Sequence, residues 1–185
     1  IFLPAIHGKQ VITSENLGNA ENLHTVQQAL YDFDGSQCGF CTPGFVMSTF
    51  ALYKQDKEPN KSEISDALTG NLCRCTGYRP ILDAAEHACS QKEDDHFCEC
   101  EDNVVKMLKS INKSETIFIN TGQQQYFIPF SKFEALKIRL ENPDAVIVTG
   151  STDVALRVTK KFEFIPKILD LSQVEEFCDF CEDEH

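Results

Sequence analysis

Four cysteines in two tight pairs are the residues of this chain best suited to chemistry. They occur as CGFC and CRC, so the four thiols belong to Cys38, Cys41, Cys73 and Cys75. Four thiolates delivered by two loops are what an iron–sulfur cluster or a tetrahedral zinc ion requires. The spacing favours the cluster, because zinc sites more often repeat CxxC than combine it with CxC.

Each cysteine pair is followed by a proline that is well placed to open a helix. Pro43 follows the first pair and Pro80 follows the second, and proline is well tolerated at the first helical position. The free N–H groups and the positive dipole end of a helix favour anionic thiolates at that position. The pattern therefore fits an electron carrier better than a structural staple.

Short helices are expected to position these two loops. Apolar residues recur at i, i+4 and i+7 in LHTVQQALYDF, where Val26, Leu30 and Phe33 form one face. The sequence predicts four helices: from about residue 23 to 33, from Pro43 to about Lys54, from Asn60 or Ser62 to about residue 69, and from Pro80 onward. Short loops between them indicate a compact bundle with both cysteine pairs at one end. One short strand is expected at residues 10–13.

The second half of the chain has a different pattern, in which strand and helix signals alternate. Strands are expected at residues 116–119, 126–129, 145–149 and 167–171, and a helix capped by Ser131 is expected to run to Leu140. The strand at 145–149 leads into the turn Gly150–Asp153, whose amides and hydroxyls can face a pyrophosphate. Such a turn is often only a connection, and neither GxGxxG nor a Walker A motif is present.

The acidity of the chain is local. The net charge is −12, but residues 93–102 and 175–185 carry six acids each with no Lys or Arg, and removing those twelve from 29 leaves 17 acids against 17 bases. Residues 91–115 are therefore interpreted as an acidic linker. Nucleic-acid binding is disfavoured, because no basic stripe is available to neutralise phosphates.

The other cysteines and the histidines give no second site. Nine cysteines exclude a fully paired disulfide framework, and no signal peptide or long apolar run supports secretion or a membrane span, so a reducing cytoplasm fits. Cys89 is expected in the core. The remaining thiols are interpreted as incidental, since acidic surroundings oppose thiolate formation; they are Cys98, Cys100, Cys178 and Cys181. The five histidines lack ligand spacing, and we expect no catalytic residue in this chain.

The residues around the four cysteines resemble a known family. GSQCGFCTPGFVMSTFALY and GNLCRCTGYRPIL closely resemble the second [2Fe–2S] domain of the molybdenum hydroxylases, which comprise xanthine dehydrogenases, aldehyde oxidases and bacterial relatives. The resemblance implies a four-helix domain whose four cysteines hold the cluster nearest the molybdopterin. A partner domain or subunit binds that molybdopterin in the family, and Gln37 is expected near it. IFLPAIHGKQVITSENL resembles the exit from a preceding plant-type ferredoxin domain.

The second half resembles the opening of the FAD-binding domain of xanthine dehydrogenases, from PFSKFEALKIRLENPDAVIVTGSTDV onward. The resemblance implies that residues 147–154 line the FAD phosphates. These residues are Ile147, Val148, Thr149, Gly150, Ser151, Thr152, Asp153 and Val154. We expect the FAD site to be incomplete within these 185 residues, because a turn contacts only part of a long dinucleotide.

The predicted fold is therefore a four-helix [2Fe–2S]-binding bundle followed by the N-terminal part of an α/β FAD-binding domain. Its expected segments are residues 1–20 (ferredoxin-domain tail), 21–90 (cluster domain), 91–115 (linker) and 116–185 (FAD domain). The resemblance implies electron transfer from molybdopterin through the cluster towards FAD and NAD, with substrate hydroxylated elsewhere. The alternatives are an aldehyde oxidase-like protein, a stand-alone iron–sulfur carrier and a zinc-stapled interaction module.

Overall fold

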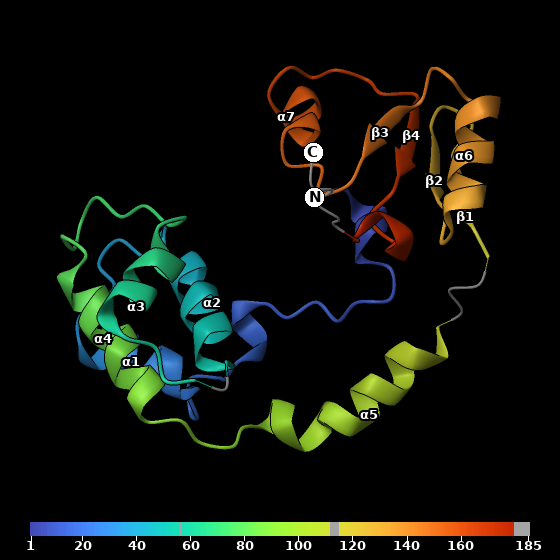
Figure 1. Ribbon diagram of the computed structural model, residues 1–185. Helices are drawn as coiled ribbons and strands as arrows, with labels where there is room; N and C mark the ends of the chain where they lie inside the picture. Colours follow the sequence, from blue (N-terminus) through green and yellow to red (C-terminus); the bar gives the residue numbers. More distant parts are fainter. Residues whose placement is uncertain (56, 112–114, 180–185) are drawn as a thin grey trace, which may run out of the picture. The chain divides into compact units, whose positions relative to one another are not determined.

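The computed structural model describes residues 1–55, 57–111 and 115–179, which belong to two compact units. Residues 11–103 form the helical unit, and residues 1–10 join residues 104–185 in the sheet unit (Figure 1). Within the described residues, no helix combines the length and apolarity that a bilayer crossing requires.

The helical unit contains four helices between residues 25 and 90. They are α1 (Thr25–Asp32), α2 (Thr42–Tyr53), α3 (Lys61–Leu68) and α4 (Arg79–Ser90). Local capping explains where two of them begin. Asn60 accepts hydrogen bonds from the first-turn amides of α3, while Glu63 bonds back to the Asn60 amide. At α1 the capping side chain is His24, and Gln27 completes the reciprocal bond.

These four helices share one apolar core. α1 packs against α4, and α2 contacts each of the other three (Figure 1). Phe45, Val26 and Ile81 are at most 1% exposed, so the packed side chains have little room to relax when one is shortened. Cys89 lies in this core, 2% exposed, as expected.

Residues 96–110, inside the segment interpreted as a linker, form a regular helix, α5 (His96–Ser110). The sequence analysis predicted no helix there, while the linker interpretation itself stays a prediction. The Asp95 carboxylate accepts hydrogen bonds from two first-turn amides and so caps the helix. Val104, Leu108 and Ile111 are partly buried at i, i+4 and i+7, a helical repeat that the acidic composition masked.

The strand expected at residues 10–13 is also absent from the described chain. This segment is irregular and lies between two 3-10 helices, η1 (Leu3–Ile6) and η2 (Ser14–Asn16). A strand needs a neighbour to satisfy its backbone groups. The backbone bonds in this segment are local turn bonds, such as Asn16 N–H to the Thr13 carbonyl.

The sheet unit is built on four strands in the order β1-β2-β4-β3. β1 (Ile117–Asn120) and β2 (Gln125–Ile128) form an antiparallel hairpin, whose turn includes Gly122 at φ +82°. β4 (Lys167–Asp170) lies between β2 and β3 (Val146–Val148), parallel to both. The helices are α6 (Lys132–Glu141) and α7 (Val154–Thr159), with η3 (Glu175–Phe177) near the end. The mixed sheet agrees with the expected α/β pattern, and β1 and β3 are its edge strands.

The apolar core of the sheet unit is small. Its buried residues fall into two clusters, one around Ile128 and Ile165 and the other around Leu169. Residues 1–10 belong to this unit, and the ring of Phe2 packs edge-on against Tyr126 at 6.2 Å. On α6, Ala135 and Ile138 are buried, whereas the large apolar side chains of this helix are mostly exposed.

Candidate metal centre

The two cysteine loops lead directly into α2 and α4. Cys41 is the N-cap residue of α2, and Pro43 lies in its first turn. Tyr78 is the N-cap residue of α4, and Pro80 lies in its first turn. Both loops use left-handed backbone conformations to reach these helices, with Gly39 at φ +80° and Gly77 at φ +70°. Glycine adopts this conformation without a steric penalty.

The structure places the four cysteines as two pairs of neighbouring thiols. The Cys38 thiol pairs with that of Cys75, and the Cys41 thiol pairs with that of Cys73. Each pair therefore takes one thiol from each loop. Cys38 and Cys75 are exposed, whereas Cys41 and Cys73 are partly buried and pack against the helical core. All four are free thiols.

Hydrogen bonds make one thiol of each pair more acidic than the other. The Thr76 hydroxyl, whose Oγ1 lies 3.2 Å from Cys73 Sγ, and neighbouring backbone amides lower the pKa of Cys73 to about 7. The pKa of Cys38 is lowered, first by the Phe40 backbone amide and then by Cys75. Burial, followed by the bond to Cys73, raises the pKa of Cys41. The contact with Cys38 raises that of Cys75, so within each pair one thiol gives up its proton more readily than its partner.

This arrangement fits a binuclear cluster. A [2Fe–2S] cluster takes its protein ligands from four cysteines, and two thiol pairs would be able to supply two sulfurs to each iron. In the described part of the chain, no group of three or more His, Cys, Asp or Glu side chains is placed to hold a single metal ion.

A second network around Cys73 was missed by sequence reasoning. The Cys73 amide donates to Tyr78 Oη at 3.0 Å, and the Tyr78 amide donates to Thr76 Oγ1 at 3.2 Å. The Tyr78 ring packs edge-on against Phe45 at 6.4 Å, which ties this loop to the core. The signal available in the sequence was the presence of two hydroxyl residues, Thr76 and Tyr78, soon after the last cysteine in CRCTGY.

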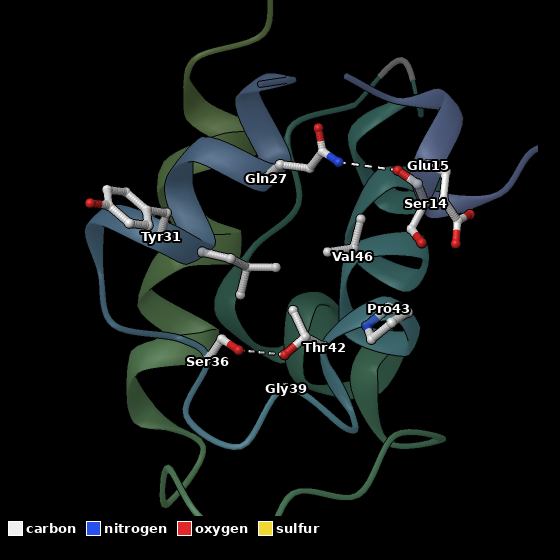
Figure 2. A pocket seen from close by; sticks show the side chains of 10 residues that line it. Ser14, Glu15, Gln27, Tyr31, Ser36, Gly39, Thr42, Pro43 and Val46 are labelled. Atoms are coloured by element: carbon white, nitrogen blue, oxygen red, sulfur yellow. Dashed lines mark hydrogen bonds between the residues drawn. The ribbon is translucent and has the colours of Figure 1, made fainter. Parts of the chain in front are cut away.

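A cavity of about 480 Å³ opens beside the first cysteine loop. Figure 2 shows its lining, which includes Gly39 of the loop and Val46 of α2. The hydroxyls of Ser36 and Thr42 are hydrogen-bonded at 2.6 Å, so this bond fastens the two ends of the loop to each other rather than to a sulfur. Gln37, expected near a pterin, lies between these ends and is exposed.

The residues expected to line FAD phosphates lie at the end of β3. Ile147 and Val148 are in the strand, and Val154 begins α7. Ser151 in the connecting turn is 8% exposed, has a left-handed φ of +60°, and its hydroxyl has no hydrogen-bond partner among the described residues. A buried hydroxyl without a partner costs free energy, so this turn has an unmet polar contact at the carboxyl ends of the parallel strands.

Next to this turn lies a buried hydrogen-bonded pair, Tyr126 and Asp170. Val148 is in register with Asp170 at the end of β4, and Asp170 is fully buried. The Asp170 carboxylate accepts hydrogen bonds from Tyr126 Oη at 2.7 Å and from the Ser172 amide at 2.9 Å. Burial and then this carboxylate raise the pKa of Tyr126 well above its ordinary range. The pair connects β2 to the C-terminal end of β4.

The expectation that the remaining thiols are not ligands stays a prediction. Cys98 and Cys100 lie on α5 and Cys178 follows η3, while Cys181 is outside the described residues. The Cys98 sulfur is 3.0 Å from the Lys54 ammonium, so its immediate surroundings are less purely acidic than the sequence indicated.

Asp95 connects the start of α5 to the helical core, a contact that the sequence did not indicate. His24 Nε2 donates to Asp95 Oδ2 at 3.1 Å, because Nδ1 already accepts the Val26 amide, and Lys54 donates to Oδ1 at 3.1 Å. Burial alone would raise the pKa of Asp95, but the bonds from His24 and Lys54 outweigh it and hold the pKa far below its ordinary value. We call this group, His24, Lys54 and Asp95, the Asp95 clasp.

Comparison with known proteins shows what the helical unit is similar to. Residues 13–86 match the [2Fe-2S] binding domain family. A xanthine dehydrogenase from Emericella nidulans is 58% identical over 84 residues, which cover 45% of this chain and 6% of that protein. One from Drosophila pseudoobscura pseudoobscura is 31% identical over an alignment covering 97% of the chain and 16% of that protein.

Aldehyde oxidases match to a similar extent. Human aldehyde oxidase is 30% identical over 93% of the chain and 16% of its own length. Among solved structures, the aldehyde oxidoreductase from Desulfovibrio gigas is 41% identical, with a TM-score of 0.41, over 42% of this chain and 9% of that one. The chain thus spans 16% or less of the length of these relatives.

Proposed function

Since the chain belongs to the family of xanthine dehydrogenases and aldehyde oxidases, we propose that its helical unit is an electron-transfer domain that holds one [2Fe–2S] cluster. The ligands are Cys38, Cys41, Cys73 and Cys75. The observation that carries this proposal is the pairing of one thiol from each loop, Cys38 with Cys75 and Cys41 with Cys73. Each pair would hold one iron. Four helices packed on one core keep the two loops at this spacing.

When bound, such a cluster would accept and release single electrons. The residues of the chain hold it and control its surroundings. The Phe40 and Thr76 backbone amides and the Thr76 hydroxyl donate towards the sulfurs, and such donors favour the anionic thiolate form. Cys38 and Cys75 are exposed, so they present one edge of the site to a neighbouring domain. No residue of this chain performs the hydroxylation.

Molybdopterin is proposed as the electron source, held on a partner domain or subunit with Gln37 facing it. Gln37 is exposed immediately before Cys38, where it is free to contact such a partner. The proposed direction of flow is from molybdopterin through this cluster towards FAD and then NAD. The free cysteines of the described chain suit a reducing compartment, and we propose the cytoplasm.

The sheet unit is proposed as the N-terminal part of an FAD-binding domain. Its support is the Ser151 hydroxyl, which is buried without a partner at the carboxyl ends of the parallel strands. Open α/β sheets commonly bind ligands at those ends, and a phosphate oxygen would satisfy the hydroxyl. This turn contacts only part of a dinucleotide, so the site is proposed to be completed by other residues of a longer protein.

An aldehyde oxidase-like role is the second candidate. Aldehyde oxidases match the chain at 30 to 32% identity over more than nine tenths of its length, as the insect xanthine dehydrogenase does at 31%. A xanthine dehydrogenase-like role, the first candidate, would place the protein in purine catabolism. Both roles use the same cluster and differ at the molybdenum site, which belongs to a partner domain in either case. A stand-alone carrier would lack that partner.

Anaerobic reconstitution with iron and sulfide tests the cluster. We expect about two iron and two sulfide per chain and a red-brown visible spectrum. A colourless protein with stoichiometric zinc would overturn the proposal in favour of a zinc-stapled module. Co-purification of the native protein with a molybdopterin-containing partner would separate the enzyme from a stand-alone carrier.

Titration with FAD tests the second site. Flavin fluorescence should be quenched only weakly by this chain, because most of a large ligand must be enclosed for tight binding. Stoichiometric sub-micromolar quenching would contradict an incomplete site.

A further inference from the structure

Among the described hydroxyl side chains near the two cysteine loops, Thr76 stands out because its proton is directed at a sulfur. Thr76 Oγ1 donates to Cys73 Sγ at 3.2 Å. The hydroxyls of Ser36 and Thr42 are bonded to each other at 2.6 Å, and the Tyr78 hydroxyl oxygen accepts from the Cys73 amide at 3.0 Å. The four thiols are therefore not equivalent: the Cys73 sulfur has a side-chain donor in addition to backbone amides.

We propose that Thr76 tunes the reduction potential of the cluster by donating its hydroxyl proton to the Cys73 sulfur, and that Tyr78 is the positioning residue that holds it there. This inference rests on the proposed function, because it assumes that Cys73 is a cluster ligand. It assigns a role to two residues that are not themselves ligands.

The physical basis is the charge that reduction adds. A one-electron reduction places one negative charge on the irons and their sulfur ligands. A hydrogen bond donated to a sulfur is stronger when that sulfur carries more charge. The bond therefore stabilises the reduced cluster more than the oxidised one, and hydrogen bonds to sulfur are among the determinants of iron–sulfur potentials. Removing the hydroxyl should make the potential more negative.

Tyr78 fixes the direction of the hydroxyl through three contacts. Its amide donates to Thr76 Oγ1 at 3.2 Å, which occupies a lone pair of that oxygen and leaves the hydroxyl proton for the sulfur. Its own Oη accepts from the Cys73 amide at 3.0 Å. Its ring packs against Phe45 of the core. The turn holds Tyr78 at φ +68°, a conformation that a bulky residue keeps only when its surroundings impose it.

The deciding experiment is spectroelectrochemistry of the reconstituted full chain with three variants. Thr76→Val removes the hydroxyl at nearly constant shape, and Thr76→Ser restores it. Thr69→Val is the matched control: Thr69 precedes the same loop, and its hydroxyl bonds to the Asp66 carbonyl rather than to sulfur. We expect Thr76→Val to lower the ratio of reduced to oxidised cluster about threefold to tenfold when both proteins are held at the same applied potential. Thr76→Ser and Thr69→Val should stay close to the parent protein.

Iron and sulfide content, measured on every sample, separates the two proposals. A parent chain that takes up zinc alone overturns both the cluster and its tuning. Full cluster content in Thr76→Val with an unchanged potential overturns only the role of Thr76, and so does an equal shift in Thr69→Val. If Thr76→Val takes up no cluster, Thr76→Ala serves in its place. Failure of both to take up a cluster would make the hydroxyl a requirement for assembly and would also overturn the tuning role.

Discussion

The helical unit and the sheet unit differ in how completely each encloses its candidate site. The helical unit has one buried apolar cluster of sixteen residues, which reaches the partly buried Cys41 and Cys73. The sheet unit has two clusters, of five and three residues. Its large apolar side chains are often exposed, with Phe133 at 78% and Phe162 at 88%. The first site is held by a complete core, and the second lies at the margin of a small one.

This difference shows that a few metal-ligand side chains can be positioned by a short segment of protein, whereas a pocket for a large ligand requires a larger domain. The four cysteines require only two loops at a fixed spacing, and four short helices supply that spacing. A dinucleotide site would need a large enclosed surface, of which the Ser151 turn would form only one edge. Substitutions in the two units should therefore change cluster content or stability by different amounts. At Ser151, a substitution should stabilise the protein, whereas the others destabilise it.

The largest expected effect is on the cluster itself. Cys73→Ser should abolish the visible absorbance after reconstitution, because it removes one sulfur from the Cys41–Cys73 pair. Iron analysis and the absorption spectrum measure the result. A chain in which Cys98, Cys100, Cys178 and Cys181 are all serine is the control and should keep its full iron content. Loss of about half the iron in that control would reveal a second metal centre, and the four ligand cysteines of the helical unit would then not be the whole iron site.

The next effect concerns packing. Phe45→Ala should destabilise the helical unit by about 3–5 kcal/mol, the usual range for a large aromatic removed from a close-packed core. Phe133→Ala, on an exposed face of the sheet unit, should change stability by less than about 0.5 kcal/mol. Urea denaturation followed by circular dichroism measures both. Similar losses in the two variants would show that the exposed apolar face is packed in solution.

An intermediate effect is expected at the Asp95 clasp. Asp95→Asn should cost about 1–3 kcal/mol at neutral pH, because a partly buried acceptor of several hydrogen bonds loses its charge. The folded pKa of Asp95 lies below its ordinary value of about 3.9. The stabilisation is therefore complete at neutral pH and is lost as the pH falls below about 4.

Denaturation of the parent and Asp95→Asn chains between pH 7 and pH 3 checks this behaviour. The stability difference between them should narrow only below about pH 4. A constant difference across the whole range would show that the Asp95 charge does not contribute.

The smallest effect should have the opposite sign. Ser151→Gly should stabilise the sheet unit by about 1 kcal/mol, because glycine relieves the left-handed backbone and removes a buried hydroxyl without a partner. Ser151→Ala keeps the backbone strain and should gain less. Thermal unfolding of the three chains measures the order. A loss of stability in Ser151→Gly would mean that the hydroxyl already has a partner in solution.

Sequence patterns predicted the regular elements better than the contacts between them. The 3.6-residue repeat located α1, and the β-branched runs located the four strands, because local burial patterns determine both. Composition misled at α5, where acidic residues hid an apolar repeat and a capping aspartate. At residues 10–13 an apolar pair without a neighbouring strand was given too much weight.

The sites divide in the same way. Cysteine types and spacing indicated the proposed ligand set, because residue types and spacing can be read directly from the sequence. The pairing of Cys38 with Cys75, the Thr76 hydroxyl on a sulfur and the Asp95 clasp depend on how loops turn in space. His24 and Asp95 are separated by 71 positions, and no periodicity connects residues so far apart.

The nested order of the thiol pairs bears on the entropy of the unfolded chain. Cys38 pairs with Cys75 outside, and Cys41 pairs with Cys73 inside, so a cluster held by both pairs would join the ends of the segment that contains α2 and α3. By analogy with a disulfide, closing a loop of about 35 residues removes about 4 kcal/mol of chain entropy from the unfolded state. The same four sulfurs that would hold the cluster would thus act as a cross-link, and loss of the iron would return that entropy to the unfolded chain.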